Sequence, residues 1–200
     1  MTIQSAVIIL ALLFTEGQGY DKRETIELRP VQRADISYFL QWFNDPEVTR
    51  YLMMYLPMTE MAEQKFIEDL GTSRSETQAF FVIEAIEGEK RRPIGSLNLH
   101  NISPKDHNAT FGIAIGDKNY CSKGYGTEAA ALIIRYGFEQ LNLHRISSGA
   151  WSFNERSIKM HLKLGFKEEG RRREAVFKNG AYCDEVMFGL LREEWRNRRP

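Results

Sequence analysis

The residues best suited to chemistry lie in a short segment, Cys121 to Thr127, that reads Cys-Ser-Lys-Gly-Tyr-Gly-Thr. An apolar, β-branched run at residues 111–116, typical of a buried strand, comes before it. After it, apolar residues recur at helical spacing as far as Leu141. Glycines at such a turn let backbone N–H groups approach a ligand closely, and the unpaired N–H groups of the first helical turn favour an anion. The segment therefore predicts a phosphate-binding loop.

This motif leaves alternatives open, because a glycine-containing turn between a strand and a helix can also bind nothing. The segment lacks the Lys-Ser/Thr ending of a nucleotide P-loop, and Ala129 stands where a dinucleotide fingerprint would have its third glycine. Both features disfavour an ATP or NAD site. Cys121, beside the loop, is either a reactive thiol or a small filling residue.

A second group of residues follows in the chain. Residues 144–151 are a strand candidate, and Asn154 to Ser157, with the sequence Asn-Glu-Arg-Ser, predicts a turn and the start of a helix. The helix continues to Leu164, and Gly165 ends it before Phe166.

With these two motifs the chain resembles the GNAT superfamily of acetyl-coenzyme A-dependent N-acetyltransferases. The superfamily signature Q/R-x-x-G-x-G/A aligns with Cys121 to Gly126, and a second motif, N-x-x-S followed by G-F, aligns with Asn154 to Phe166. The resemblance extends from about Thr25 to Trp195. It is closest to the branch of ribosomal-protein N-terminal acetyltransferases and spermidine acetyltransferases, through Leu-Arg-Pro at 28–30 and Trp-Phe-Asn-Asp-Pro-Glu-Val at 42–48.

The resemblance implies an α/β (α+β) fold of the GNAT type in a single domain. Its central sheet would be mixed, mostly antiparallel and twisted, and flanked by helices. The strands near 111–116 and 144–151 would diverge to admit the pantetheine arm of the cofactor. We expect residues 25–200 to form this domain and residues 1–24 to be an N-terminal extension.

The resemblance also implies acetyl-coenzyme A as co-substrate, with no metal. Backbone N–H groups of 112–115 would hold the arm and polarise the thioester carbonyl, and those of 123–127 would hold the pyrophosphate. Asn154 would bond the cofactor arm, although it could equally serve as a helix N-cap. The expected cofactor-binding residues are Ile113, Ala114, Ile115, Cys121, Ser122, Lys123, Gly124, Tyr125, Gly126, Thr127, Asn154 and Ser157.

The catalytic residues are less well determined. The family commonly has a tyrosine that protonates the leaving thiolate at the position of His161, so His161 is the expected general acid, or else a histidine of the core or surface. Glu84, His100 and Glu47 are candidate general bases. His100 is the favoured one of the three, and its alternative role is an exposed turn residue.

The acceptor expected from this branch is a protein N-terminal amine, with a polyamine or an aminoglycoside as alternatives. A polycation would need a cluster of carboxylates, which Glu47, Glu60, Glu63 and Asp69 could supply. The Met- and aromatic-rich segment 51–58 is either ordinary core or a wall of the acceptor pocket. Because the usual tyrosine is missing, a catalytically silent acyl-coenzyme A-binding sensor is the alternative from another class.

Periodicity and turn residues predict the other elements that must position these groups. Strands are expected at 25–29, 78–86, 93–99, 165–169 and 184–191, helices at 34–43, 47–54 and 59–70, a hairpin turn at 178–180, and a solvated tail at 192–200.

Composition narrows the function classes further. The chain has 200 residues with 27 basic and 27 acidic side chains, so no overall field favours nucleic acid. Its 2 cysteines form neither a metal motif nor a disulfide framework, which suits a cytoplasmic protein. The apolar run at 6–14 has no preceding Lys or Arg and is too short to span a bilayer. We expect no membrane partner, and a homodimer is possible.

Overall fold

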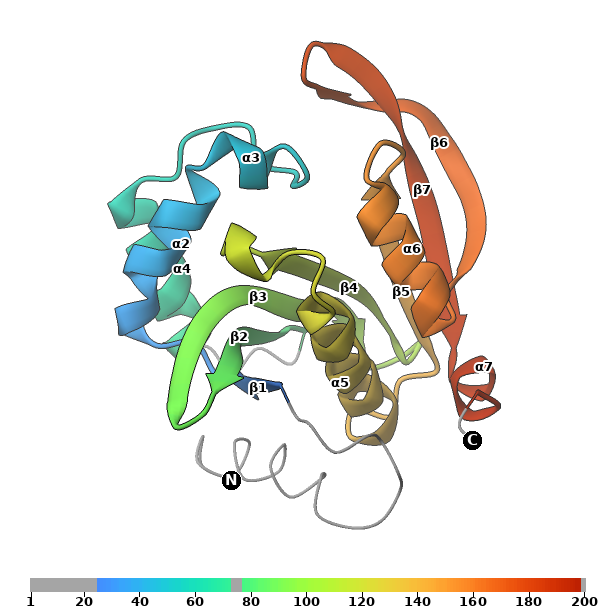
Figure 1. The fold of residues 1–200 in the computed structure, drawn as a ribbon. Coiled ribbons are helices and arrows are strands. Elements are labelled where there is room, and N and C mark those ends of the chain that lie inside the picture. Colours follow the sequence, from blue (N-terminus) through green and yellow to red (C-terminus); the bar gives the residue numbers. More distant parts are fainter. Residues whose placement is uncertain (1–24, 73–76, 199–200) are drawn as a thin grey trace.

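The computed structural model describes residues 25–72 and 77–198 (Figure 1). The extension expected at residues 1–24, with its apolar run, lies outside the described residues. Within the described ranges, no helix combines the length and the hydropathy needed to cross a membrane.

A seven-stranded sheet in the order β1-β2-β3-β4-β5-β7-β6 forms the centre of the fold. Neighbouring strands are antiparallel except β4 and β5, which are parallel. The strands are β1 (Ile26–Arg29), β2 (Ala79–Glu87), β3 (Lys90–Ser103), β4 (Asn108–Ile115), β5 (Arg145–Trp151), β6 (Lys167–Lys178) and β7 (Ala181–Leu191). The mixed, mostly antiparallel sheet expected from the sequence is confirmed.

The parallel pair β4 and β5 stays together for only part of its length (Figure 1). Its last paired residues are Thr110 and Ser147. Beyond them β4 continues to Ile115 while paired only with β3, and β5 continues to Trp151 while paired only with β7. The sheet therefore opens between these strands, and main-chain groups on the facing edges are left without strand partners.

Helices cover both faces of the sheet. One side is covered by the first helices of the chain and the other by the long helix that follows the glycine loop (Figure 1). The helical elements are η1 (Arg33–Asp35), α2 (Ile36–Phe43), α3 (Pro46–Thr49), α4 (Glu60–Thr72), η2 (Lys118–Tyr120), α5 (Tyr125–Glu139), α6 (Glu155–Leu164) and α7 (Arg192–Arg196).

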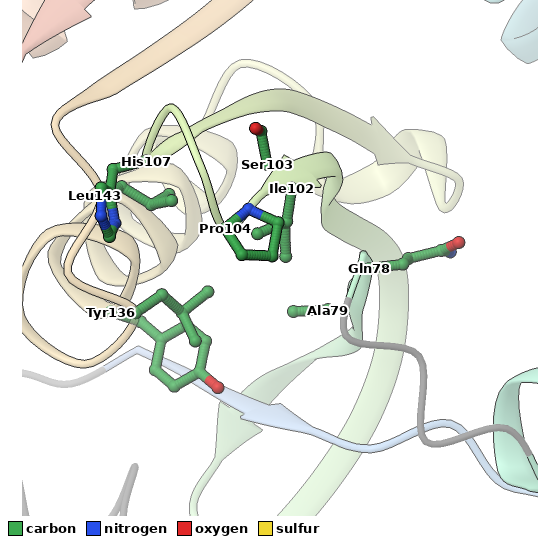
Figure 2. A pocket seen from close by; sticks show the side chains of 9 residues that line it. Gln78, Ala79, Ile102, Ser103, Pro104, His107, Tyr136 and Leu143 are labelled. Carbon is green, nitrogen blue, oxygen red and sulfur yellow. The ribbon is translucent and has the colours of Figure 1, made fainter.

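A cavity of about 340 Å³ lies at the C-terminal end of α5, and Figure 2 shows the side chains that line it. Tyr136 of α5 and Leu143 form one side, and Ala79 of β2 and Ile102 of β3 form the other. None of its lining residues belongs to the glycine loop or to the second motif. This cavity is therefore separate from the residues that the sequence predicts to be functional.

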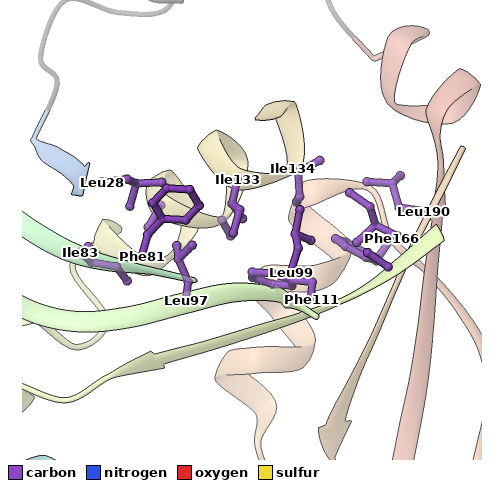
Figure 3. Close-up of a cluster of buried hydrophobic side chains, with 14 of the residues drawn as sticks. Leu28, Phe81, Ile83, Leu97, Leu99, Phe111, Ile133, Ile134, Phe166 and Leu190 are labelled. Atoms are coloured by element: carbon purple, nitrogen blue, oxygen red, sulfur yellow. The ribbon is translucent and has the colours of Figure 1, made fainter. Parts of the chain in front are cut away.

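The larger core lies between the sheet and α5 (Figure 3). Side chains alternate along β2, so that Phe81 and Ile83 point into this core while Val82 faces α2 and α4. On α5, Ile133 and Ile134 supply the facing apolar surface. Buried side chains recur at every second residue on the strand and at helical spacing on α5. Because these two spacings differ, the sequence pattern predicted both elements correctly.

A buried ion-pair network joins the first strand to the first helices. Arg29 of β1 donates two hydrogen bonds to the carboxylate of Asp35, both of 2.7 Å, and one of 2.7 Å to Glu84 of β2. Asp35 is buried, and the Arg29 side chain is nearly so. Glu84, expected as a candidate base, is therefore a structural partner of Arg29, and its carboxylate is already engaged in this network.

Two expectations need correction. The helix expected at 47–54 ends at Thr49. The Lys178 amine at the end of β6 donates to the carbonyls of Thr49 (3.3 Å) and Met54 (2.6 Å) and so holds the non-helical segment that follows. The tail expected to be solvated forms α7, whose Trp195 ring packs on Phe138 of α5 at 5.2 Å. Both segments thus contact residues far from them in sequence.

Candidate functional site

The glycine loop has a backbone shaped for an anion. Ser122 and Gly124 have left-handed conformations, with φ of 60° and 97°, and Gly124 is the N-cap of α5. In the described part of the chain, the amides of Ser122 through Gly126 have no hydrogen-bond partner. The amide of Thr127, in contrast, donates to the Gly124 carbonyl at 2.9 Å. The structure therefore removes the Thr127 amide from the predicted set and leaves the others free to bind.

Gly126 brings this loop close to β4. A Cβ at this position would lie 3.5 Å from Cγ1 of Ile115 and 3.9 Å from Cδ1 of Ile113. The space beside the free amides is thus bordered by the strand that opens away from β5. A ligand that binds these amides can continue along the edge of β4.

Positive charge around the loop comes from an expected residue and an unexpected one. Lys123 is exposed in the loop itself. Arg156, at the start of α6, contacts Cys121 and also lies 5.0 Å above the ring of Tyr51. Burial raises the pKa of the Cys121 thiol, so a filling role suits it better than a reactive one. The sequence reasoning missed Arg156, although it stands inside the second motif.

The opening between β4 and β5 begins at a side-chain bridge. The hydroxyl of Ser148 on β5 lies 3.0 Å from the carbonyl of Phe111 on β4. Since main-chain groups alternate in direction along an antiparallel strand, Ile113 and Ile115 also face the opening, while Ala114 pairs with β3. Of the three β4 residues expected to bind the cofactor, Ala114 is therefore the one whose main-chain groups already pair with β3.

Asn154 caps α6, because its side chain accepts the amide of Ser157 at 3.2 Å. The glycine at 165 ends the helix with a φ of 94°, as the sequence predicted. These two residues fix the short helix that carries Ser157 and His161 on the same side, one turn apart.

The structure changes the role expected of His161. The ring is 1% exposed and stacks on Phe188 of β7 at 4.7 Å. Its Nδ1 lies 2.7 Å from the Ser157 carbonyl, and its Nε2 lies 2.7 Å from the Ser148 hydroxyl. A carbonyl can only accept, so Nδ1 carries a proton that is already bonded.

Burial also lowers the pKa of His161, which favours the neutral ring. A neutral ring with Nδ1–H bonded to Ser157 has no proton on Nε2, so Nε2 can only accept a hydrogen bond from the Ser148 hydroxyl. The single proton of that hydroxyl is then shared between Nε2 and the Phe111 carbonyl as alternative acceptors. This arrangement does not suit a direct general acid. The core role, which the sequence left as the alternative, agrees with the geometry.

A second cavity, of about 360 Å³, lies on the opposite face of the opened strand. The backbone of β4 from Gly112 to Ala114 forms part of its wall, so the cavity and the opening share this stretch of strand. The other lining residues come from α2, α4, β2, β3 and the Met-rich segment: Phe43, Leu52, Met54, Met58, Glu63, Phe66, Phe80, Ser96, Leu97, Asn98 and His100. The Met-rich segment is therefore a cavity wall.

His100 lies in this cavity with a defined orientation. Its Nδ1 is 3.0 Å from Oδ1 of Asn98, two residues earlier on the same face of β3. An amide oxygen accepts, so Nδ1 is the protonated nitrogen and Nε2 is left with a free lone pair. Partial burial lowers the pKa of His100, which keeps the ring neutral at pH 7. His100 thus has the protonation state that a general base needs.

The acidic residues that could have formed a cluster do not meet in the cavity. Of Glu47, Glu60, Glu63 and Asp69, Glu63 is the one that lines it. Glu47 is exposed and pairs with Lys118 at 2.8 Å, Asp69 pairs with Lys65 at 3.5 Å, and Glu60 is exposed. Glu47, expected as a candidate base, therefore lies outside the cavity lining, and the carboxylate cluster that a polycation would need does not form within the described residues. These residues also hold no group of His, Cys, Asp or Glu that could bind a metal.

Comparisons with known proteins agree with this arrangement. A family model described as an acetyltransferase (GNAT) domain matches residues 25–167. The uncharacterised N-acetyltransferase p20 of Bacillus licheniformis is 31% identical over 176 residues, covering 86% of this chain and 96% of that protein. The spermidine N(1)-acetyltransferase of Escherichia coli K12 is 32% identical over 175 residues, covering 86% of this chain and 88% of that protein.

Among solved structures, the spermidine N-acetyltransferase of Vibrio cholerae in complex with CoA and spermine is similar in fold. It superposes with a TM-score of 0.80 at 23% identity, covering 88% of this chain and all of the other. At this level of identity the likeness establishes the fold alone.

Proposed function

The chain belongs to the GNAT family of N-acetyltransferases, and on this basis we propose that it transfers the acetyl group of acetyl-coenzyme A to a primary amine. One observation carries the proposal: residues 112–114 of β4 border the cleft that opens toward β5 and also form a wall of the cavity on the other face. A thioester in the opening and an amine in the cavity can meet there. Because this thioester is an intracellular metabolite, the proposal includes a cytoplasmic location and a catalytic domain that starts at residue 25.

The chain's own residues fit the phosphates and arm of the cofactor. The unpaired amides of Ser122 to Gly126, at the N-terminus of α5, would bind the diphosphate, and Lys123 would add charge. Main-chain groups of Ile113 and Ile115 would hold the pantetheine arm, with Asn154 and Ser157 on the α6 side. Acetyl-coenzyme A supplies the activated acetyl group.

The acceptor must lose a proton before it can attack. A primary amine with pKa near 10.4 is about 0.04% free base at neutral pH, whereas an α-amine with pKa near 8 is about 10% free base. We propose that Nε2 of His100 accepts this proton from the amine. The His100 ring is neutral, and the hydrogen bond from its Nδ1 to Asn98 fixes its orientation. An N–H of β4 would stabilise the charge that develops on the carbonyl oxygen, an effect of about 2.7–4 kcal/mol for one such donor in other enzymes.

The preferred acceptor is the N-terminal amine of a protein. Its lower pKa needs less help from a base, and the cavity offers mainly apolar walls in which a first side chain could lie. A polyamine is the second candidate, supported by the name of the Escherichia coli relative. The absence of a carboxylate cluster among the described residues counts against it.

The test is acetyl-coenzyme A turnover by the full chain with N-terminal peptides, polyamines and aminoglycosides as acceptors. Turnover is measured by the release of the free coenzyme A thiol. Turnover on at least one amine supports the proposal. Tight acetyl-coenzyme A binding without turnover on any of them would instead indicate a silent sensor, and no binding at all would refute both functions.

A further inference from the structure

Glu63 is the group in the acceptor cavity whose presence the reaction described above does not explain. Its side chain is 1% exposed, and its Oε1 atom has no hydrogen-bond partner among the described residues. Buried carboxylates in native proteins are nearly always paired, because an unpaired buried charge is strongly unfavourable. A carboxylate kept here without a partner is therefore ready for a cation that arrives with the substrate.

The surroundings of Glu63 limit what that cation can be attached to. The walls beside it are the apolar side chains of Phe66, Phe80, Leu52, Met54 and Met58. Outside the cavity the same segments continue with exposed apolar residues, with Met53 78%, Leu56 68% and Met61 84% exposed. An acceptor that fills this cavity needs an apolar body.

The charges nearby limit the number of positive groups. Glu63 is the acidic residue among the lining residues of the cavity. Glu47 of α3 and Asp69, further along α4 itself, already pair with lysines. A polyamine would bury its further ammonium groups without carboxylates to match them, which is unfavourable.

We propose that Glu63 selects the acceptor by binding its ammonium group, and that the acceptor is a primary amine with one positive charge on an apolar body. The inference rests on the function proposed above and gives its substrate class. Two sources share this chemistry, a peptide whose first side chain is apolar and a small alkylamine. Glu63 is a binding residue in this scheme, and His100 still accepts the proton that the ammonium group of the acceptor must lose.

The test begins with binding by calorimetry, using the full chain saturated with coenzyme A. Hexylamine should bind about tenfold or more tightly than hexan-1-ol, the range expected for one charge-assisted hydrogen bond, and spermidine should bind no more tightly than hexylamine. Glu63→Gln should abolish the preference for hexylamine. Asp69→Asn removes one exposed charge from the same helix and should leave the preference unchanged.

Glu63→Gln is expected to fold. Burial raises the pKa of Glu63, so its charged form is disfavoured in the native state, and an amide of the same shape removes that penalty. If wild type does not distinguish the amine from the alcohol, or if Glu63→Gln keeps the preference, the inference is wrong. Tighter binding of spermidine than of hexylamine would also overturn it.

Turnover separates the inference from the function on which it rests. With an active amine, Glu63→Gln should raise KM for the amine about tenfold or more and leave KM for acetyl-coenzyme A unchanged. If peptides are the natural acceptors, a peptide beginning with Leu should be acetylated with a higher kcat/KM than the same peptide beginning with Glu. If small amines are the natural acceptors, hexylamine should have a higher kcat/KM than either peptide. Amine binding through Glu63 without any turnover would refute the acetyltransferase proposal and leave the inference standing.

Discussion

Replacing Gly126 with alanine should separate the phosphate-binding loop from the stability of the fold. Gly126 is the second residue of α5, and an added Cβ would meet Ile115 at 3.5 Å and Ile113 at 3.9 Å, which are ordinary van der Waals distances. The folded protein therefore has room for the methyl group. That room is the space between the free amides and β4, where the cofactor arm must leave the diphosphate.

The two effects have opposite signs. Alanine favours a helix over glycine by about 0.8–1.0 kcal/mol in helix interiors, so near the first turn we expect a gain of about 0.5 kcal/mol and a slightly raised Tm. Loss of one hydrogen bond to a charged phosphate weakens binding by about 1.5–3 kcal/mol. The expected affinity for coenzyme A is therefore about 10- to 150-fold lower.

Gly137→Ala, the same substitution about 16 Å further along the same helix at a rise of about 1.5 Å per residue, is the matched control. Its Cβ would lie 3.0 Å from Leu99, 3.1 Å from Leu143 and 3.2 Å from Ile146, all in the core. Overpacking of this kind costs about 1–3 kcal/mol. This variant should lose thermal stability and keep its coenzyme A affinity while folded.

Thermal unfolding and calorimetric titration with coenzyme A, on wild type and both variants, measure the two quantities separately. The reasoning is refuted if Gly126→Ala binds coenzyme A as tightly as wild type. It is also refuted if Gly126→Ala unfolds at a markedly lower temperature, because the methyl group would then not fit the space that the structure leaves.

Three further predictions concern titratable groups. Because His100 must be neutral and burial lowers its pKa, kcat/KM should fall only below pH 6.5, and His100→Gln should lose about 10²- to 10⁴-fold in turnover; a variant that keeps wild-type turnover contradicts this. Arg29→Ala strands the carboxylates of Asp35 and Glu84 and should cost about 3–5 kcal/mol in urea unfolding, whereas a loss below about 1 kcal/mol would show that water replaces the guanidinium. Since the pKa of His161 is lowered, the native state binds fewer protons than the unfolded state, so stability should fall as the pH drops below 6.5. His161→Phe should weaken that dependence and keep the wild-type pH profile of turnover, and a changed turnover profile would restore the acid role.

Local sequence patterns were sufficient for the elements that position the cofactor. The alternation along β2 and β4 and the helical spacing after Gly126 each depend on neighbouring residues, and the glycine loop is a contiguous motif. These features require no knowledge of distant contacts. The length of β3 was underestimated because the charged residues before Pro93 are typical of a turn, although their pairing with β2 extends the strand to Lys90.

Residue roles that depend on distant partners could not be obtained in the same way. His161 occupies the expected helix position, but Ser148 and Phe188, which decide its burial, come from other strands. Glu84 looked like a free carboxylate until Arg29 of β1 was placed beside it. Four acidic residues looked equivalent in sequence, and only the packing of α4 against the sheet turns Glu63 inward.

The amine of Lys178, at the tip of the C-terminal hairpin, bonds to the carbonyls of Thr49 and Met54 and so braces one wall of the acceptor cavity. The shape of this wall consequently depends on two segments more than a hundred residues apart in the chain. A chimaera that transplants residues 49–58 from a relative should inherit that relative's substrate preference only when the matching hairpin is exchanged with it.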